Sequence, residues 1–454
     1  MLKALGYAAL WSLGILLLGV SLGRAFRGAS LPPHLLGHPV VVLPDLLDAT
    51  QQAELLSLAH EIGSFGSVTG AENSYNMTHE DIGEGLAHPA RVDGGCSHAF
   101  LVPSKNTKRC ILPGRVDVGR HYVLTGGVEG LKEQHADLAS RAQSFIAYIF
   151  DPSRHASTAK LLNSTAFLAA ARAVCPQRDA AVLDPFQTSI IVQVPGQTVP
   201  AHLDGVWLWG ADRFHVPQWL LAVMAFSGLF SERFVHQVQI VGYFGPPGVN
   251  GRSGGAFTHW ANGRAEAVPC TPGSGSSMDG SKTVHAAAVF EPAAAPPALS
   301  KDAVNALVHV PGAGAGGGGE WELRTNGAPR GRWAAGRLRF SVVYRARCFS
   351  SEAERAAFAA AQRTGEGRLD LEVGILAPLK DEAVRRGAAA SREQLDALPR
   401  LDLALKLLDT FIAYPRPDVP LPLNYCALPL AFPGAQWLAR VVGAVCPRRA
   451  APGM

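Results

Sequence analysis

The chain has 454 residues, with 41 lysine and arginine residues against 37 aspartate and glutamate residues, and its formal net charge is +4. Apolar residues make up 48% of the chain and charged residues 17%, which excludes a disordered polyelectrolyte and leaves enough apolar side chains for a sizeable core. Basic residues are scattered along the sequence, so the charge pattern also argues against a nucleic-acid-binding protein.

The N-terminal segment from Ala4 to Gly23 contains no charged residue and has basic residues on both sides. At ~1.5 Å per residue, a helix of this length spans the ~30 Å hydrocarbon core of a membrane. We expect residues 1–30 to be a signal anchor and neck; a signal peptide that is cleaved near residues 28–30 is the alternative. The rest of the chain would then lie in the lumen of the endoplasmic reticulum or Golgi, or be secreted after cleavage.

Sequons and cysteines agree with a luminal glycoprotein. The sequons lie at Asn76 and Asn163, and the chain has seven cysteines without a CxxC pair, which excludes a zinc ribbon. The odd count permits three disulfides and one free thiol in an oxidising compartment, and ordinary buried cysteines are the alternative. The spacing does not identify the pairs.

The first part of the chain predicts a strand followed by helices. Residues 40–43 form a β-branched apolar run bounded by prolines, and Asp48 with Gln51 forms a capping box for the helix that follows. Residues 64–130 are rich in Gly, Asn and Asp and are predicted to be irregular. Further helices are predicted at 131–150 and 157–174.

From residue 186 the sequence predicts a series of short strands separated by Gly, Pro, Asn and Asp. These strands are expected at 189–194, 219–226, 234–244, 255–260, 283–290 and 338–345. Such spacing is typical of a β-sandwich or barrel. Residues 291–331 are rich in Ala, Pro and Gly and are predicted to be a surface insertion, and the chain beyond 351 is predicted to be helical.

A short sequence echo connects the two helical regions. The segments 145–148 (FIAY) and 173–176 (AVCP) return in the same order at 411–414 and 444–447. The echo indicates either a partial repeat of 131–178 within a C-terminal region, 350–454, or chance similarity in an alanine-rich chain.

The residues with the clearest chemistry are His202 and Asp204, at positions i and i+2 of a predicted strand. Side chains at this spacing point to the same face, so an imidazole and a carboxylate can meet at one point. A third ligand on another strand, His285, leaves coordination positions open, as non-haem Fe(II) requires. The rival third ligands are His215, His236, His259 and His309.

A second pair of polar residues, Arg339 and Ser341, heads the last predicted strand at the same spacing. A guanidinium forms bidentate hydrogen bonds with carboxylates, so this pair suits the distal end of a dicarboxylate. Arg337 replaces Arg339 if the strand register differs by two.

With these motifs, residues 39–349 resemble the 2-oxoglutarate- and Fe(II)-dependent dioxygenases, nearest to the prolyl-4-hydroxylase-like branch. The resemblance rests on the strand and helix at 40–62, the PGQxxPxHxD stretch at 195–204, Gly254-Gly255, and residues 281–285. It implies an α+β chain with a double-stranded β-helix (jelly roll) at 185–349, flanking helices, and a support region at 31–184.

The resemblance also implies site residues and departs from the family in one respect. His202, Asp204 and His285 would hold iron, and Arg339 with Ser341 would bind 2-oxoglutarate. Prolyl hydroxylases usually place a lysine about ten residues after the distal histidine, but residue 295 is alanine here. The arginine instead lies beyond the 291–331 insertion, so the substrate need not be a prolyl residue.

The expected activity is hydroxylation of a protein or peptide side chain, with prolyl residues among the candidates and nucleic acid excluded. Fe(II), 2-oxoglutarate and O2 are the implied cofactors, with ascorbate as a further one to be tested. We expect an aromatic mouth from Trp207, Trp209 and Trp219. The alternatives are a non-catalytic, membrane-anchored jelly-roll binding module and a metal-dependent hydrolase with the same three ligands.

Overall fold

The computed structural model describes residues 30–67, 88–89, 96, 100–103, 109–149, 155–246, 254–299, 303–312, 319–431 and 446. The predicted membrane segment and the sequon at Asn76 lie outside these residues. Within them, no helix is both long and apolar enough to cross a membrane.

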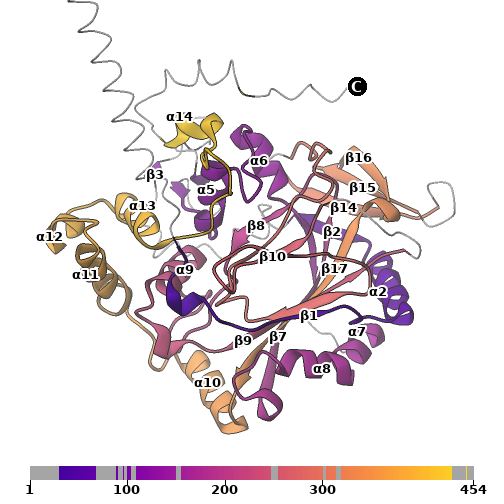
Figure 1. The fold of residues 1–454 in the computed structure, drawn as a ribbon, viewed down its shortest axis with the longest axis horizontal. Coiled ribbons are helices and arrows are strands. Elements are labelled where there is room, and N and C mark those ends of the chain that lie inside the picture. The colour runs from indigo at the N-terminus through magenta and orange to yellow at the C-terminus, as the bar shows by residue number, and fades with distance from the viewer. Residues whose placement is uncertain are drawn as a thin grey trace, which may run out of the picture.

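Two antiparallel sheets form the centre of the protein (Figure 1), and a third, short sheet lies beside them. The large sheet has ten described strands in the order β1 (Val40–Leu43), β12 (Gly275–Met278), β9 (Gln237–Phe244), β17 (Arg339–Phe349), β7 (Val182–Gln193), β6 (Phe145–Tyr148), β2 (Ser64–Ser67), β14 (Asn305–Val310), β15 (Glu320–Thr325) and β16 (Ala328–Ala334). The small sheet has the order β11 (Glu266–Val268), β10 (Phe257–His259), β13 (His285–Ala287) and β8 (Val199–His202). The short sheet contains β3 (His88–Pro89), β5 (Arg109–Ile111) and β4 (Val102–Pro103).

Eight of these strands pair in a nested fashion, first with last. β7 pairs with β17, β8 with β13, β9 with β12, and β10 with β11, all antiparallel. Successive strands alternate between the two sheets as far as β10, and the later strands retrace the same path in reverse. This winding places β8 beside β13, although many residues separate them in the sequence.

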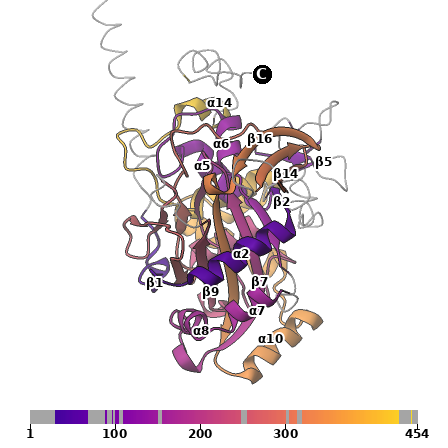
Figure 2. The same ribbon diagram turned by 90° about the vertical axis from the view of Figure 1, so that its right-hand side faces the viewer.

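Helices cover the outer faces of both sheets (Figures 1 and 2). On the large sheet lie α2 (Ala49–Ile62), α7 (Ala156–Leu162) and α8 (Thr165–Arg172), and residues of this layer such as Leu55 and Phe167 share one core with Ile190 of β7 and Phe340 of β17. Outside the small sheet lie α5 (Val116–Thr125), α9 (Gln218–Ser227), α11 (Ala377–Arg385) and α13 (Arg400–Phe411), which share a second core with β8 and β13.

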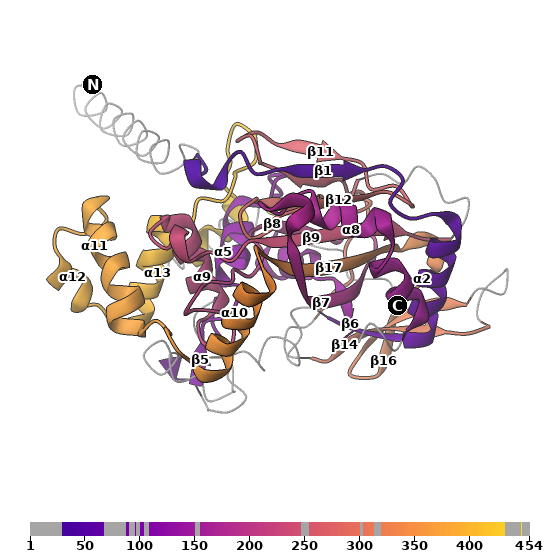
Figure 3. The ribbon, with the colours of Figure 1, turned by 90° about the horizontal axis from the view of Figure 1, so that it is seen from below.

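The remaining helices are short or peripheral. They are η1 (Pro33–Leu35), α6 (His135–Arg141), η5 (Arg178–Ala180), η6 (Ser231–Arg233), η7 (Ala335–Arg337), α10 (Glu352–Thr364), the π-helical η8 (Leu371–Leu376), α12 (Arg392–Asp396), η9 (Tyr425–Ala427) and α14 (Leu428–Ala431). Figure 3 shows α11, α12 and α13 gathered at one end of the protein, next to α9. In the described residues from 352 to 431 all the regular elements are helices, as predicted for the region beyond residue 351.

The first strand and helix are confirmed in detail. β1 covers the predicted residues, and α2 begins at the predicted capping box. The Asp48 side chain accepts a hydrogen bond from the Gln51 backbone at 2.8 Å, and the Gln51 side chain accepts one from the Asp48 backbone at 2.9 Å. The helix ends at Gly63, which has a left-handed conformation.

The strand predicted at 219–226 is wrong, because these residues form the helix α9. Residues 219–226 of α9 are all apolar and all buried, so this stretch has no polar positions to show a helical period. Pro217 precedes the first turn of α9, and Gly228 follows its last turn in the left-handed conformation. Proline before the first turn and glycine after the last are typical signals of helix ends.

The helices predicted at 131–150 and 157–174 are each only partly present. The first is limited to α6, and residues 145–148 form β6, which pairs with β2 and β7. The second is interrupted at Asn163, after which Ser164 caps α8. The echoed segment 411–414 differs from β6, since it is the end of α13 and the extended residues that follow. The echo is therefore not a structural repeat at these residues.

Residues 291–331 and 64–130 were expected to be irregular, but both segments contain strands or helices. The 291–331 insertion holds β14, β15 and the start of β16, which extend the large sheet beyond β2. Within 64–130, the described residues include β2 and the helix α5. The expected domain boundary at 184/185 falls inside β7, and β1, β2 and β6 of the support region belong to the same sheet as β7.

The cysteines form three disulfides and leave one thiol. The pairs are Cys96–Cys110, Cys175–Cys348 and Cys426–Cys446, and Cys270 is free. Of the two readings of the odd cysteine count, the structure therefore supports the one with three bridges.

Candidate metal centre

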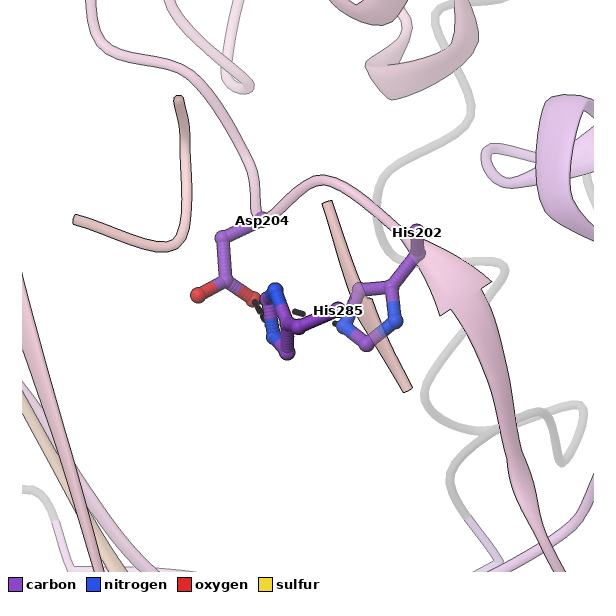
Figure 4. Close-up of side chains that lie close together, drawn as sticks. All are labelled: His202, Asp204 and His285. Carbon is purple, nitrogen blue, oxygen red and sulfur yellow. Dashed lines mark ion pairs between the residues drawn. The ribbon is translucent and has the colours of Figure 1, made fainter. Parts of the chain in front are cut away.

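The three predicted ligands come together between the two sheets (Figure 4). His202 is the last residue of β8, His285 is the first of β13, and these two residues face each other in the strand register. The Oδ1 atom of Asp204 lies 3.6 Å from Nε2 of His202 and 4.0 Å from Nε2 of His285. No other group of three or more His, Cys, Asp or Glu side chains is close enough to hold a metal ion in the described part of the chain.

Backbone carbonyls set the orientation of both imidazoles. Nδ1 of His202 lies 2.8 Å from the carbonyl oxygen of Pro200, and Nδ1 of His285 lies 2.9 Å from that of Thr283. A carbonyl oxygen can only accept, so each Nδ1 carries the proton and each Nε2 presents a lone pair. Metal-binding histidines in proteins are usually oriented by such a hydrogen bond from the other ring nitrogen.

The surroundings also favour the ionisation states that a metal ion requires. Burial by itself raises the pKa of Asp204, but the positive charge of Arg345 and the two imidazoles hold this pKa well below its usual range. Burial and the neighbouring His202 lower the pKa of His285 to about 3. The site therefore offers a carboxylate and a neutral imidazole at neutral pH, which are the forms that bind metals.

The turn from Asp279 to Ser281, which precedes His285 in the chain, packs against Asp204. The backbone N–H of Asp204 donates to the carbonyl oxygen of Gly280 at 2.8 Å, and Asp279 accepts hydrogen bonds from the backbone and hydroxyl of Ser281. A Cβ atom at Gly280 would lie only 2.1 Å from Oδ2 of Asp204. Residue 280 must therefore be glycine for the carboxylate to keep this position.

Arg339, rather than Arg337, points into the space between the sheets. Its guanidinium lies 4.9 Å from the ring centroid of Tyr243, and its Nη2 atom lies 3.4 Å from Sγ of Cys270. Arg337 is instead an exposed residue that pairs with Glu291. Of the two arginines that the sequence left open, Arg339 is therefore the one enclosed by the protein, and its role toward a cofactor stays a prediction.

The second predicted cofactor residue, Ser341, is also on β17. Its hydroxyl donates to the backbone carbonyl of Ile191 at 3.4 Å, which is a long hydrogen bond. The hydroxyl is therefore only weakly engaged by the protein itself.

Arg345 and Gln239 are the site residues that sequence reasoning missed. Nη2 of Arg345 donates to Oδ1 of Asp204 at 2.5 Å, and its Nε donates to the side-chain oxygen of Gln239 at 2.6 Å. Nε2 of Gln239 in turn lies 3.3 Å from Nε2 of His285. Alternation along β17 could have identified Arg345, because residues 339, 341, 343 and 345 share one face of the strand.

The three tryptophans do not form the expected aromatic mouth. Trp207 and Trp209 pack against Phe358, and Arg347 lies over the ring of Trp207. Trp219 is a buried residue of α9. Phe257 is an aromatic residue beside the centre, and its ring centroid lies 6.1 Å from that of His285.

Two sets of unpaired polar atoms show what the site fits. Oδ2 of Asp204 is buried without a hydrogen-bond partner, close to the Nε2 atoms of two imidazoles. Nε and Nη1 of Arg339 are likewise buried without a partner. A divalent metal ion would satisfy the first set, and a carboxylate would satisfy the second.

Searches with the sequence find no relative: no family model and no curated protein matches the chain. Solved structures do match. A Pseudomonas putida prolyl-4-hydroxylase is 14% identical, with a TM-score of 0.29, over 68% of this chain and 93% of its own. A Trichoplax adhaerens prolyl hydroxylase, solved with a hypoxia-inducible-factor peptide, is 10% identical, with a TM-score of 0.30, over 70% and 86%.

A further match is the non-heme alpha-ketoglutarate-dependent epimerase SnoN from nogalamycin biosynthesis. It is 11% identical, with a TM-score of 0.27, and the match covers 72% of this chain and 83% of the epimerase. Similarity at these TM-scores assigns no function by itself.

Proposed function

We propose that this protein is a 2-oxoglutarate- and Fe(II)-dependent dioxygenase. The observation that carries the proposal is the convergence of His202, Asp204 and His285 inside the same sheet pair that encloses the guanidinium of Arg339, whose Nε and Nη1 atoms are buried without a hydrogen-bond partner. In this proposal, the eight nested strands, which are β7 to β13 together with β17, form a double-stranded β-helix.

Each of these side chains has a defined task. Two imidazoles and one carboxylate would hold Fe(II) on one side and leave the remaining positions for 2-oxoglutarate and O2. Arg339, helped by Ser341, would bind the distal carboxylate of 2-oxoglutarate. When bound, these cofactors supply the oxidation of a substrate C–H bond, with conversion of 2-oxoglutarate to succinate and CO2.

The remaining residues of the centre orient the ligands and control their charge. Arg345 keeps Asp204 ionised and fixes its Oδ1 atom, and Gln239 links Arg345 to the ring of His285. The carbonyls of Pro200 and Thr283 keep the protons on Nδ1 of both histidines. Burial of Asp204 and His285 limits the access of water to the centre.

We further infer that the substrate is a protein or peptide side chain in the secretory lumen, with prolyl residues among the candidates, and that ascorbate supports turnover. The luminal location is supported by three disulfides, which persist in oxidising compartments. It is also supported by the uncharged segment from Ala4 to Gly23, which would anchor the protein in the membrane.

Turnover of labelled 2-oxoglutarate tests the proposed function. Purified protein with Fe(II) and ascorbate should release labelled succinate and CO2 even without a prime substrate. Arg339→Ala should raise the KM for 2-oxoglutarate about 100-fold, because two charge-assisted hydrogen bonds of about 1.5 kcal/mol each are lost. Arg337→Ala is the matched control and should leave this KM unchanged.

Other outcomes would contradict the proposal in different ways. Bound zinc without turnover of 2-oxoglutarate would favour a hydrolase with the same ligands. Binding of neither metal nor 2-oxoglutarate would favour a non-catalytic jelly roll.

A further inference from the structure

A tyrosine from the C-terminal region reaches the backbone between two of the candidate metal ligands. Tyr414 follows α13, and its side chain is only 1% exposed. Its hydroxyl accepts a long hydrogen bond, of 3.4 Å, from the backbone N–H of Leu203. Leu203 lies between His202 and Asp204, so this contact holds the segment that carries both ligands.

The hydroxyl of Tyr414 belongs to a small, closed polar network. It donates to Oδ2 of Asp117 at 2.7 Å and accepts from Nη2 of Arg115 at 3.4 Å. Asp117, whose side chain is fully buried, forms a further ion pair with Arg115 at 3.0 Å. A phenol has one donor and two acceptor sites, and all of them are used here. Such a network has a single favourable arrangement.

The packing around Tyr414 gives it little freedom. The edge of its ring lies against Phe226 of α9, with 5.1 Å between the ring centroids, and the ring of His121 lies 5.6 Å away. Leu203 is fully buried in the same core as Tyr414, Val284 and Ala286. The backbone N–H of Leu203 therefore depends on a protein partner, because water does not reach it.

We propose that Tyr414 is a positioning residue for the metal centre, through which the C-terminal helical region fixes the backbone from 202 to 204. The proposal deepens the proposed function, because the segment that Tyr414 holds is the one that would bind iron. It also assigns a role to the C-terminal region, whose helix α13 packs against α9 on the outside of the small sheet.

Hydrogen exchange of the metal-free, full-length protein tests this role directly. In Tyr414→Phe, a peptide covering 199–206 should exchange about tenfold faster than in the wild type, because the Leu203 N–H loses its acceptor. Tyr344→Phe is the matched control: it removes the same atom from a buried tyrosine in the core of the large sheet and should leave this peptide unchanged. Equal exchange in Tyr414→Phe and wild type would overturn the proposal.

Titration with Co(II) alone gives the second measurement. The Kd for Co(II) should rise about tenfold in Tyr414→Phe and stay constant in Tyr344→Phe, as is usual when a group that orients metal ligands is lost. An unchanged Kd in Tyr414→Phe would show that the contact does not position the ligands, whatever the exchange rate.

A second variant covers the case in which Tyr414→Phe does not fold. Asp117→Asn retains the tyrosine and weakens the acceptor of its proton, so exchange of the same peptide should still accelerate; no acceleration would count against the network. If the wild type binds no Co(II), the proposed function fails, while the exchange measurement still decides whether Tyr414 holds this segment.

Discussion

The ionisation state of the candidate ligands follows from the contacts of individual side chains. Asp204 stays charged because Arg345 donates to it, and His285 stays neutral because it is buried beside His202. These two residues reach the forms that bind a metal by opposite means, one by pairing and the other by burial. The metal-free protein should therefore be sensitive to acid at this centre.

The stability of the metal-free protein should fall as the pH falls below 6.5. The folded state holds His285 at a pKa of about 3 against an ordinary value of 6.5, so between these values only the unfolded chain binds this proton. Between pH 7 and pH 5 this group should reduce the free energy of unfolding by about 2 kcal/mol. Asp204, whose pKa is also lowered, adds to the loss only in more acidic solution.

Urea unfolding in the presence of a chelator measures this effect. The comparison protein is His285→Gln, which keeps a neutral polar side chain that does not titrate. Its free energy of unfolding should depend less on pH than that of the wild type. The same pH dependence in both proteins would show that His285 does not carry the effect.

At the scale of elements, short segments acquire their roles from what they pair with. The four residues at 145–148 form β6 between β2 and β7, whereas the identical four residues at 411–414 end α13 and place Tyr414 beside Leu203. The turn from Asp279 to Ser281 is a second example, since it brings a backbone carbonyl to Asp204 and starts the approach to β13.

A single methyl group in that turn should disable the metal centre. In Gly280→Ala the new Cβ atom would meet Oδ2 of Asp204 at 2.1 Å, so the carboxylate or the turn must move. We expect the Kd for Co(II) to rise at least tenfold, because the displaced group is itself a ligand. Gly245→Ala, where no atom lies within 4 Å of the new Cβ, is the control and should bind Co(II) as the wild type does. Normal Co(II) binding by Gly280→Ala would contradict the expectation that this contact fixes a metal ligand.

At the scale of the whole molecule, distant parts of the chain extend the central pair of sheets and supply the helices that pack on it. The 291–331 insertion widens the large sheet, and the C-terminal helices close the outer side of the small sheet. The disulfide between Cys175 and Cys348 links the segment after α8 to β17, and its loop contains the other seven nested strands and β17 as far as Cys348.

This disulfide should contribute more stability than the one near the C-terminus. It closes a loop with a sequence separation of 173 residues, against 20 for Cys426–Cys446. The loop-entropy model predicts a difference of about 2 kcal/mol in the free energy of unfolding. Double Cys→Ala variants of each pair, compared by urea unfolding, measure it. A larger loss for the Cys426 and Cys446 pair would contradict this account.

The sequence by itself determined the features that depend on short-range spacing. The capping box of α2 and the position of Arg339 and Ser341 on one strand face follow from the repeat of a helix or a strand. His202 and Asp204 were expected on one strand, but β8 ends at His202 and Asp204 lies two residues beyond it. His285 could also be proposed from the sequence, because it follows a turn and lies on a β-like run.

Only the tertiary structure decided which distant residues meet. It brought His285, and none of the four rival histidines, to His202 and Asp204, it enclosed the guanidinium of Arg339 and left Arg337 exposed, and it placed Arg345 beside Asp204 and Tyr414 beside Leu203. It also made a helix of α9, whose uniformly apolar sequence shows no period. These outcomes depend on strand pairing and packing between residues far apart in the chain, and no local periodicity records them.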